Sequence, residues 1–179
     1  MIYIFKLQQD EVWNKIKVDS AKLYAYYLKT KNKYVWPNRV DFNEIFEISN
    51  STAKALYDSL KNGANFSKLA AKHTERIGYK IRRGSYGLKP INFSILSEKA
   101  NGLQKPGEFS KPFKTRGGYS IVQLVKKDPS HLKTFEEAKP EVSSAFQNAE
   151  SKRLENAYIE RLKEIYHPII YYNRLEEAF

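Results

Sequence analysis

Glu44 occupies the position in this sequence that most strongly suggests chemistry. Residues 40–48 alternate in character and predict a strand. One face of that strand would carry Val40, Phe42, Glu44, Phe46 and Ile48. An unpaired carboxylate between two phenylalanines would be costly to bury, and Arg76 and His73 are candidate partners. Glu44 is therefore either part of a hydrogen-bonded site or a structural polar contact without a catalytic role.

Several other chemistries find no support in the sequence. The chain has no cysteine, which excludes thiolate nucleophiles, disulfides and cysteine-based zinc sites. His73, His131 and His167 are far apart and have no partner at ligand spacing, so we expect no metal site. The glycines do not form a phosphate-binding GxGxxG pattern. We expect neither a metal nor a cofactor.

Composition and charge narrow the class of protein. The 179 residues are 41% hydrophobic, enough for a packed core in one large domain or in one domain with a satellite lobe. Residues 39–128 hold 17 of the 31 Lys and Arg residues but only 8 of the 20 Asp and Glu residues. This excess either favours acidic ligands or is a solvated basic surface. No apolar run is long enough to span a bilayer, and residues 1–7 lack the features of a signal peptide, so we expect a fragment of a longer protein.

The middle of the chain predicts the elements that would position these side chains. Residues 119–125 form an apolar strand with both faces covered, which the Gly117-Gly118 pair joins to a preceding strand in a tight hairpin. A first strand at 40–48, helices at 52–62 and 66–70, a basic loop at 77–87 and a helix at 95–103 precede it. This order predicts an α+β fold, a small antiparallel sheet wrapped by helices.

These motifs resemble those of parvulin-type peptidyl-prolyl isomerase domains. The segment GANFSKLAAKHT at 63–74 is similar to a family signature of Gly-x-x-Phe-x-x-Leu-Ala, and Gly-Glu, Ser-x-Pro, Thr and Gly-Tyr-x-Ile follow in the family's order within 107–121. The resemblance implies rotamase activity without a cofactor. Such a site combines an apolar proline pocket with a hydrogen-bonding cluster beside the twisting amide and excludes water.

The resemblance also implies site residues. The family's first histidine, loop acid or thiol, threonine and second histidine fall on Glu44, Arg76, Thr115 and Ser120. Only Thr115 is kept, so we expect weakened catalysis. We hypothesise that Arg76, or Thr115 with Ser120, holds Glu44 in place of the histidine network. The resemblance assigns substrate binding to Tyr86, Phe93, Leu96 and Tyr119.

The two ends of the chain predict helices that pack together. We expect helices at 7–17 and 20–31, and a long helix from the capping box at Thr134 to about residue 166, kinked or split by Pro140. A short strand at 169–172 could lie beside residues 2–5. Flanking helices of this kind resemble the chaperone lobe of SurA-like foldases. The expected domains are 1–38, 39–128 for the parvulin-like domain, and 129–179 packing with 1–38.

The resemblance implies an isomerase and folding chaperone in the periplasm or otherwise outside the cytoplasm of bacteria. Its clients would be unfolded or proline-containing polypeptides, and the charge favours acidic ones. One alternative is a peptide-binding chaperone of the same fold without catalysis. A further alternative, a basic nucleic-acid-binding domain, is disfavoured because the basic residues accompany no recognition helix or RNP-type motif.

Overall fold

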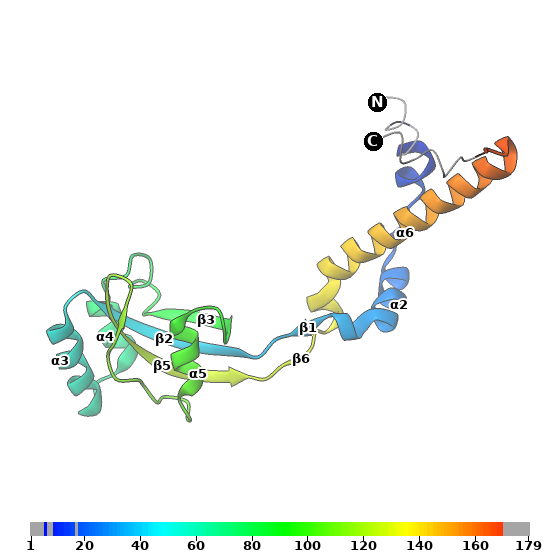
Figure 1. The fold of residues 1–179 in the computed structure, drawn as a ribbon. Coiled ribbons are helices and arrows are strands. Elements are labelled where there is room, and N and C mark those ends of the chain that lie inside the picture. Colours follow the sequence, from blue (N-terminus) through cyan, green and yellow to red (C-terminus); the bar gives the residue numbers. More distant parts are fainter. Residues whose placement is uncertain (1–5, 7–8, 17, 170–179) are drawn as a thin grey trace. The chain divides into compact units, whose positions relative to one another are not determined.

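The computed structural model describes residues 6, 9–16 and 18–169. It forms two compact units (Figure 1). One unit is Val35–Leu132, and the other combines the chain before Val35 with the chain from Lys133 onward. Helices and small antiparallel sheets together confirm the predicted α+β class.

The Val35–Leu132 unit is built on a four-stranded antiparallel sheet with the order β3-β2-β5-β4. Strands β2 (Arg39–Glu47) and β5 (Gly118–Asp128) lie in the middle, and β3 (Ser85–Pro90) and β4 (Phe113–Thr115) lie at the edges. The register places Glu44 opposite Val122 and Phe46 opposite Ser120. A separate two-stranded ladder joins β1 (Val35–Trp36) to β6 (His131–Leu132).

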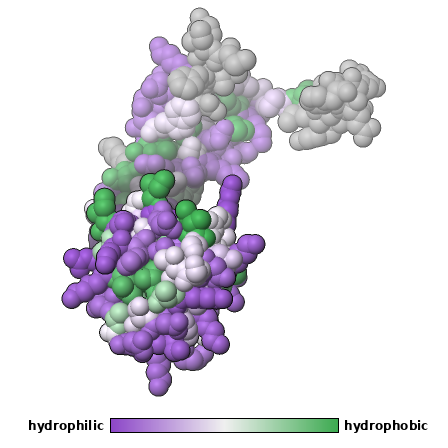
Figure 2. All heavy atoms as spheres, turned by 90° about the vertical axis from the view of Figure 1, so that its left-hand side faces the viewer, coloured by the Kyte–Doolittle hydropathy of each residue, from purple (hydrophilic) through white to green (hydrophobic). Residues whose placement is uncertain are grey.

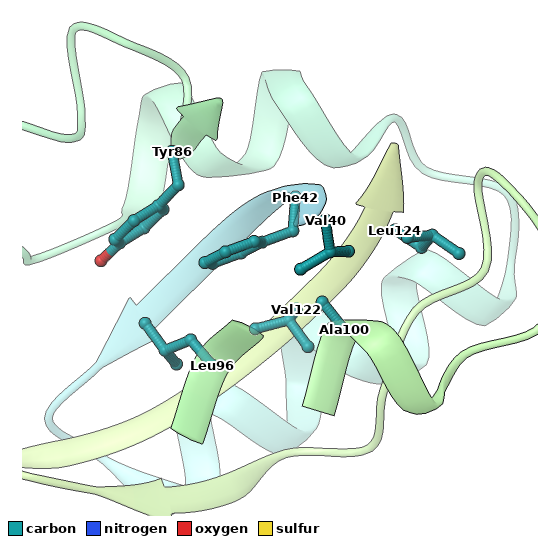
Figure 3. Packing of buried hydrophobic residues seen from close by; sticks show 7 residues of the cluster. All are labelled: Val40, Phe42, Tyr86, Leu96, Ala100, Val122 and Leu124. Carbon is teal, nitrogen blue, oxygen red and sulfur yellow. The ribbon is translucent and has the colours of Figure 1, made fainter. Parts of the chain in front are cut away.

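Helices cover both faces of this sheet. The first face packs against α5 (Ile95–Gly102), and Figure 3 shows Leu96 and Ala100 of this helix facing Val122 and Phe42 of the sheet. The opposite face packs against α3 (Asn50–Lys61) and α4 (Phe66–His73). Its buried residues are Ile45, Leu56, Leu60, Phe66, Ala70 and Ile121. Burial on both faces explains why β5 carries apolar side chains at successive positions, Ile121 and Val122.

Side-chain caps fix the starts of the helices. Ser49, Asn65 and Ser94 each accept a hydrogen bond from a backbone N–H in the first turn of α3, α4 and α5. Such a bond satisfies a donor that the helix leaves free, and its loss typically costs about 1 kcal/mol. The caps therefore set where each helix begins to cover the sheet.

The helical unit contains η1 (Trp13–Lys15), α2 (Ser20–Thr30), η2 (Lys31–Lys33) and α6 (Phe135–Tyr166). Its core consists of Leu23, Tyr34, Ala138, Val142 and Phe146. Asp19 caps α2, and Thr134 with Glu137 forms the predicted capping box of α6. Among the described helices, none combines the length and the apolar character needed to cross a bilayer.

Three expectations for the chain ends are either corrected by the structure or fall wholly or partly outside the described residues. Helix α6 continues through Pro140, so the predicted separation of its first turn is wrong. Only about one turn precedes Pro140, and the backbone bond that it forfeits would have gone to the exposed Glu136. Of the helix predicted at 7–17, residues 9–16 are described. Residues 9–11 are helical, and η1 follows at Trp13–Lys15. The strand pair at 2–5 and 169–172 lies outside the described residues, apart from Ile169.

Candidate functional site

Glu44 lies at the centre of a buried network of polar side chains, with 1% of its surface exposed. Its Oε2 accepts hydrogen bonds from Arg76 Nε at 2.8 Å and from the Tyr86 hydroxyl at 2.6 Å. Its Oε1 accepts from Arg76 Nη2 at 3.0 Å and from Ser120 Oγ at 2.6 Å. Thr115 Oγ1 lies 2.9 Å from Ser120 Oγ. The carboxylate that would be costly to bury alone is therefore fully bonded.

Each hydrogen bond between hydroxyl groups in this network has a defined donor and acceptor. Ser120 gives its single proton to Glu44, so at the 2.9 Å contact Thr115 donates and Ser120 accepts. Burial raises the pKa of Tyr86 well above its ordinary value, and the hydrogen bond to Glu44 raises it further. Tyr86 is therefore a proton-bearing donor at any physiological pH.

Arg76 is the part of this network that reaches solvent. Its side chain is 30% exposed, whereas that of Glu44 is 1% exposed. Burial opposes the charge of Arg76, but the hydrogen bonds and charge of Glu44 outweigh that effect, and the pKa of Arg76 is raised. The guanidinium also lies over the Phe46 ring, 4.2 Å from its centroid. Two of its N–H groups bind Glu44, and its remaining donors could bind another acceptor.

Backbone contacts hold these groups on β2. Phe46 N donates to Thr74 Oγ1 at 3.0 Å, and Glu75 N donates to Phe46 O at 2.8 Å, which positions Arg76 directly after them. Along the same edge of β2, Glu44 N donates to Gly84 O at 2.9 Å. Gly84 has φ +79°, and a Cβ there would lie 2.2 Å from Glu44 O. Only glycine fits this close approach.

The structure brings together Glu44, Arg76, Thr115 and Ser120, the four residues that the resemblance assigned to the polar site. Glu44 takes Arg76 as its cationic partner in preference to His73. Of the hypothesised contacts, Arg76 and Ser120 bind Glu44 directly, whereas Thr115 reaches it only through Ser120. Their catalytic role stays a prediction. The sequence did not indicate that Tyr86 would belong to this network, although a tyrosine where the family has an apolar residue was a usable signal.

The residues assigned to substrate binding have different surroundings. Tyr86 and Leu96 are 9% and 7% exposed and belong to the cluster that packs on Phe42, where the Tyr86 ring stacks at 4.7 Å between centroids (Figure 3). Phe93 is 56% exposed, with Lys89 Nζ 5.3 Å from its ring centroid. Tyr119 is half-buried at the start of β5. Two of the four therefore contribute to the core, and two can be reached from solvent.

A pair of carboxyl groups, Glu47 and Glu75, was not anticipated from the sequence. Glu47 is 5% exposed, and burial, together with the charge of Glu75 and a hydrogen bond to it, raises the pKa of Glu47 to about 7. Its Oε1 has no hydrogen-bond partner among the described residues. Glu75 Oε2 accepts from Ile48 N at 2.6 Å. The alternation of β2 places Glu47 on the face of Ile45, which is the signal that could have found it.

This sheet order, wrapped by α3, α4 and α5 and carrying a polar network between β2 and β5, defines a parvulin-type domain. A family model described as the PPIC-type PPIASE domain matches residues 18–140, more than half of the chain. The chain therefore belongs to this family of peptidyl-prolyl cis-trans isomerase domains.

The chain is also similar to known foldases. Cbf2 of Campylobacter jejuni is 27% identical over 161 residues, covering 86% of this chain and 59% of Cbf2. Foldase protein PrsA 2 of Listeria monocytogenes is 31% identical over 122 residues, covering 66% of this chain and 41% of PrsA 2. This chain therefore spans only part of the length of these relatives.

One solved structure supports the likeness over most of the chain. It belongs to work on PEB4 and Cj1289, two SurA-like chaperones of Campylobacter jejuni. It matches with a TM-score of 0.58 and 26% identity, covering 95% of this chain and 70% of that one. The predicted family and its SurA-like relationship are confirmed.

Proposed function

We propose that this chain is the isomerase and chaperone part of a bacterial foldase that acts outside the cytoplasm, with weakened catalysis. Its substrates would be proline-containing segments of unfolded polypeptides. Support comes from the family of the domain and from relatives named as foldases and SurA-like chaperones. One observation mainly supports the proposed weakened catalysis: the hydrogen bonds run in one direction, from Thr115 to Ser120 and from Ser120 to Glu44.

Prolyl isomerisation breaks no covalent bond, so the site must bind the twisted amide better than either planar form. The barrier to rotation of a peptide bond is about 18–20 kcal/mol. In this network Glu44 and Ser120 are buried and position their neighbours, while Arg76 and Thr115 are partly exposed. Arg76 would donate to a substrate carbonyl. Thr115 would accept from a substrate N–H, because its own proton is directed at Ser120.

An isomerisation assay on a proline peptide tests this function. The chain should accelerate the reaction above the uncatalysed rate, and Thr115→Val should lower the acceleration about three- to tenfold, the value of one neutral hydrogen bond. Thr52→Val, on α3, is the matched control and should keep the rate. If Glu44→Gln changes neither the melting temperature nor the rate, the network has no functional role.

The second candidate is a peptide-binding chaperone of the same fold without catalysis. It is favoured by the burial of Tyr86 and Leu96, which fill space in the core where a proline pocket was predicted. This function predicts no acceleration of the proline peptide, whereas an unfolded client protein still binds and is protected from aggregation. The same preparation can be used in both assays, so their outcomes separate the two functions.

The domain limits, clients and location are further parts of the proposal. The isomerase domain would be 39–128, with 1–38 and 129–179 forming a chaperone lobe. Acidic clients would be attracted by the positive charge of 39–128, and charge reversal at Arg82 and Arg83 should weaken their binding. A periplasmic or other extracytoplasmic location is supported by the periplasmic protein in the SurA-like pair. Steeply salt-dependent binding to duplex or single-stranded nucleic acid would contradict the expectation of a polypeptide client.

A further inference from the structure

The loop between Arg76 and Ser85 presents two isoleucines to solvent. Ile77 is 96% exposed and Ile81 is 92% exposed, the highest values among the large hydrophobic side chains of the described residues. On the face seen in Figure 2, hydrophobic residues lie in groups among hydrophilic ones. A branched aliphatic side chain exposed to this degree gains little from the fold, so a pair of them four residues apart indicates an external partner.

Hydrogen bonds hold this loop in a defined conformation. Tyr79 N donates to Arg76 O at 3.2 Å, Arg83 N donates to Lys80 O at 3.0 Å, and Gly84 N donates to Tyr79 O at 2.9 Å. The Tyr79 ring stacks on Tyr86, with 4.2 Å between the centroids. The loop therefore packs inward through Tyr79. The exposure of Ile77 and Ile81 is a property of its folded form.

The loop that carries the two isoleucines also carries three cationic side chains. Lys80, Arg82 and Arg83 are exposed on the same loop, and neither arginine forms an ion pair with any acidic residue that the structure describes. Arg83 also contributes to a cavity of about 590 Å³. The other residues lining this cavity are Asn65, Ser67, Lys68, Ala71 and Lys72. The cavity thus presents three cationic side chains and hydrogen-bond donors, without a carboxylate.

We propose that this loop docks the domain on the surface of an anionic lipid bilayer. Ile77 and Ile81 would enter the boundary between headgroups and acyl chains, and Lys80, Arg82 and Arg83 would lie at the level of the headgroups. The cavity lined by Lys68, Lys72 and Arg83 is suited to a headgroup phosphate. This proposal does not depend on isomerase activity.

The degree of exposure favours a bilayer over a polypeptide partner. A bound peptide takes its affinity from a groove or sheet edge that encloses alternate side chains. Side chains exposed by more than nine-tenths have no enclosing walls and instead project outward. Projecting aliphatic groups with cations on the same loop match a bilayer interface, where anionic headgroups cover an apolar layer of acyl chains. An acidic polypeptide remains as an alternative outcome of the test.

Co-sedimentation of the full chain with lipid vesicles tests the proposal. The chain should bind vesicles that contain phosphatidylglycerol and should bind poorly to vesicles of phosphatidylcholine alone. Replacing Arg82 and Arg83 together by glutamine should weaken binding about thirtyfold, the effect expected for two cations at an anionic surface. Replacing Ile77 and Ile81 together by serine should weaken it at least about tenfold. Matched controls are Ile48→Ser, at a site 64% exposed outside the loop, and the pair Lys54→Gln and Lys61→Gln on α3.

A fluorescent label reports whether the loop itself makes the contact. Because the chain has no cysteine, Lys80→Cys and Lys54→Cys each give a single labelling site. An environment-sensitive dye should shift to the blue on anionic vesicles at position 80 and stay unchanged at position 54. Equal binding to both vesicle types, equal losses in the control variants, or binding of an acidic peptide in the absence of vesicle binding would each overturn the lipid assignment. Circular dichroism of every variant verifies that it is folded.

Discussion

Breaking the ion pair of Glu44 and Arg76 one partner at a time should reveal how strongly it holds the Val35–Leu132 unit. In Arg76→Met the Glu44 carboxylate, 1% exposed, keeps its bonds from Tyr86 and Ser120 but loses both bonds from the guanidinium. An uncompensated buried charge costs about 3–5 kcal/mol. Because 30% of the Arg76 side chain is exposed, water can partly replace the guanidinium in this variant. We therefore expect the free energy of unfolding to fall by about 3 kcal/mol, at the lower end of that range.

The partner variants complete a double-mutant cycle. Glu44→Gln leaves Arg76 partly solvated and deprives one hydroxyl of its acceptor, so we expect a loss of about 2 kcal/mol. The double variant contains no buried charge and should lose less than the sum of the two single variants. The expected coupling is about 2 kcal/mol.

Urea unfolding monitored by tryptophan fluorescence measures these values in the unit concerned. The chain has two tryptophans, so a Trp13→Phe background leaves Trp36, in β1, as a reporter within the Val35–Leu132 unit. If the losses of the two single variants add up to that of the double variant within about 0.5 kcal/mol, the reasoning is refuted, because independent sites behave in that way. A loss below about 1 kcal/mol in Arg76→Met would show that Glu44 is not held as a buried charge.

Three further perturbations follow from particular residues. The pKa of Glu47 is raised from 4.5 to about 7, so the native state disfavours its charge and stability falls as pH rises through this window. Above pH 7, Glu47→Gln should be more stable than the parent by at most about 3 kcal/mol and should melt at a higher temperature. Below pH 4.5 the two should melt at the same temperature in thermal scans, and a difference there would contradict this. Gly84→Ala should destabilise by about 2 kcal/mol more than Gly63→Ala in urea unfolding, since both glycines have positive φ but only the Gly84 Cβ would clash with Glu44 O, and equal losses would contradict this. Phe146→Ala should cost the helical unit about 3 kcal/mol while the Trp36 transition stays unchanged, and a shift of that transition would show that the two units unfold together.

Much of the fold could be predicted because its signals are local. The alternation of residues 40–48 predicted β2, observed at Arg39–Glu47, and the apolar run at 119–125 predicted β5 with both faces covered. The capping box at Thr134 marked the start of α6. These signals depend on neighbours within a few residues, and so they can be read directly from the sequence.

The candidate site was only partly predictable because its contacts join residues far apart in the chain. Glu44 is 32 residues from Arg76, 42 from Tyr86 and 76 from Ser120. The sequence suggested Arg76 and Ser120 as its partners but not the Tyr86 hydroxyl. The acid pair of Glu47 and Glu75 was likewise missed, because the raised pKa of Glu47 depends on how tertiary packing buries it beside a second carboxyl group.

The sequence by itself determined the α+β class, the helix starts, the family resemblance and the need for a partner at Glu44. Only the tertiary structure decided which donors meet that carboxylate, that Tyr86 and Leu96 are core residues, and that Ile77 and Ile81 face solvent. The reason is physical. Secondary structure follows from the chain's local conformational preferences, whereas hydrogen-bond partners, burial and pKa depend on which distant segments the sheet places side by side.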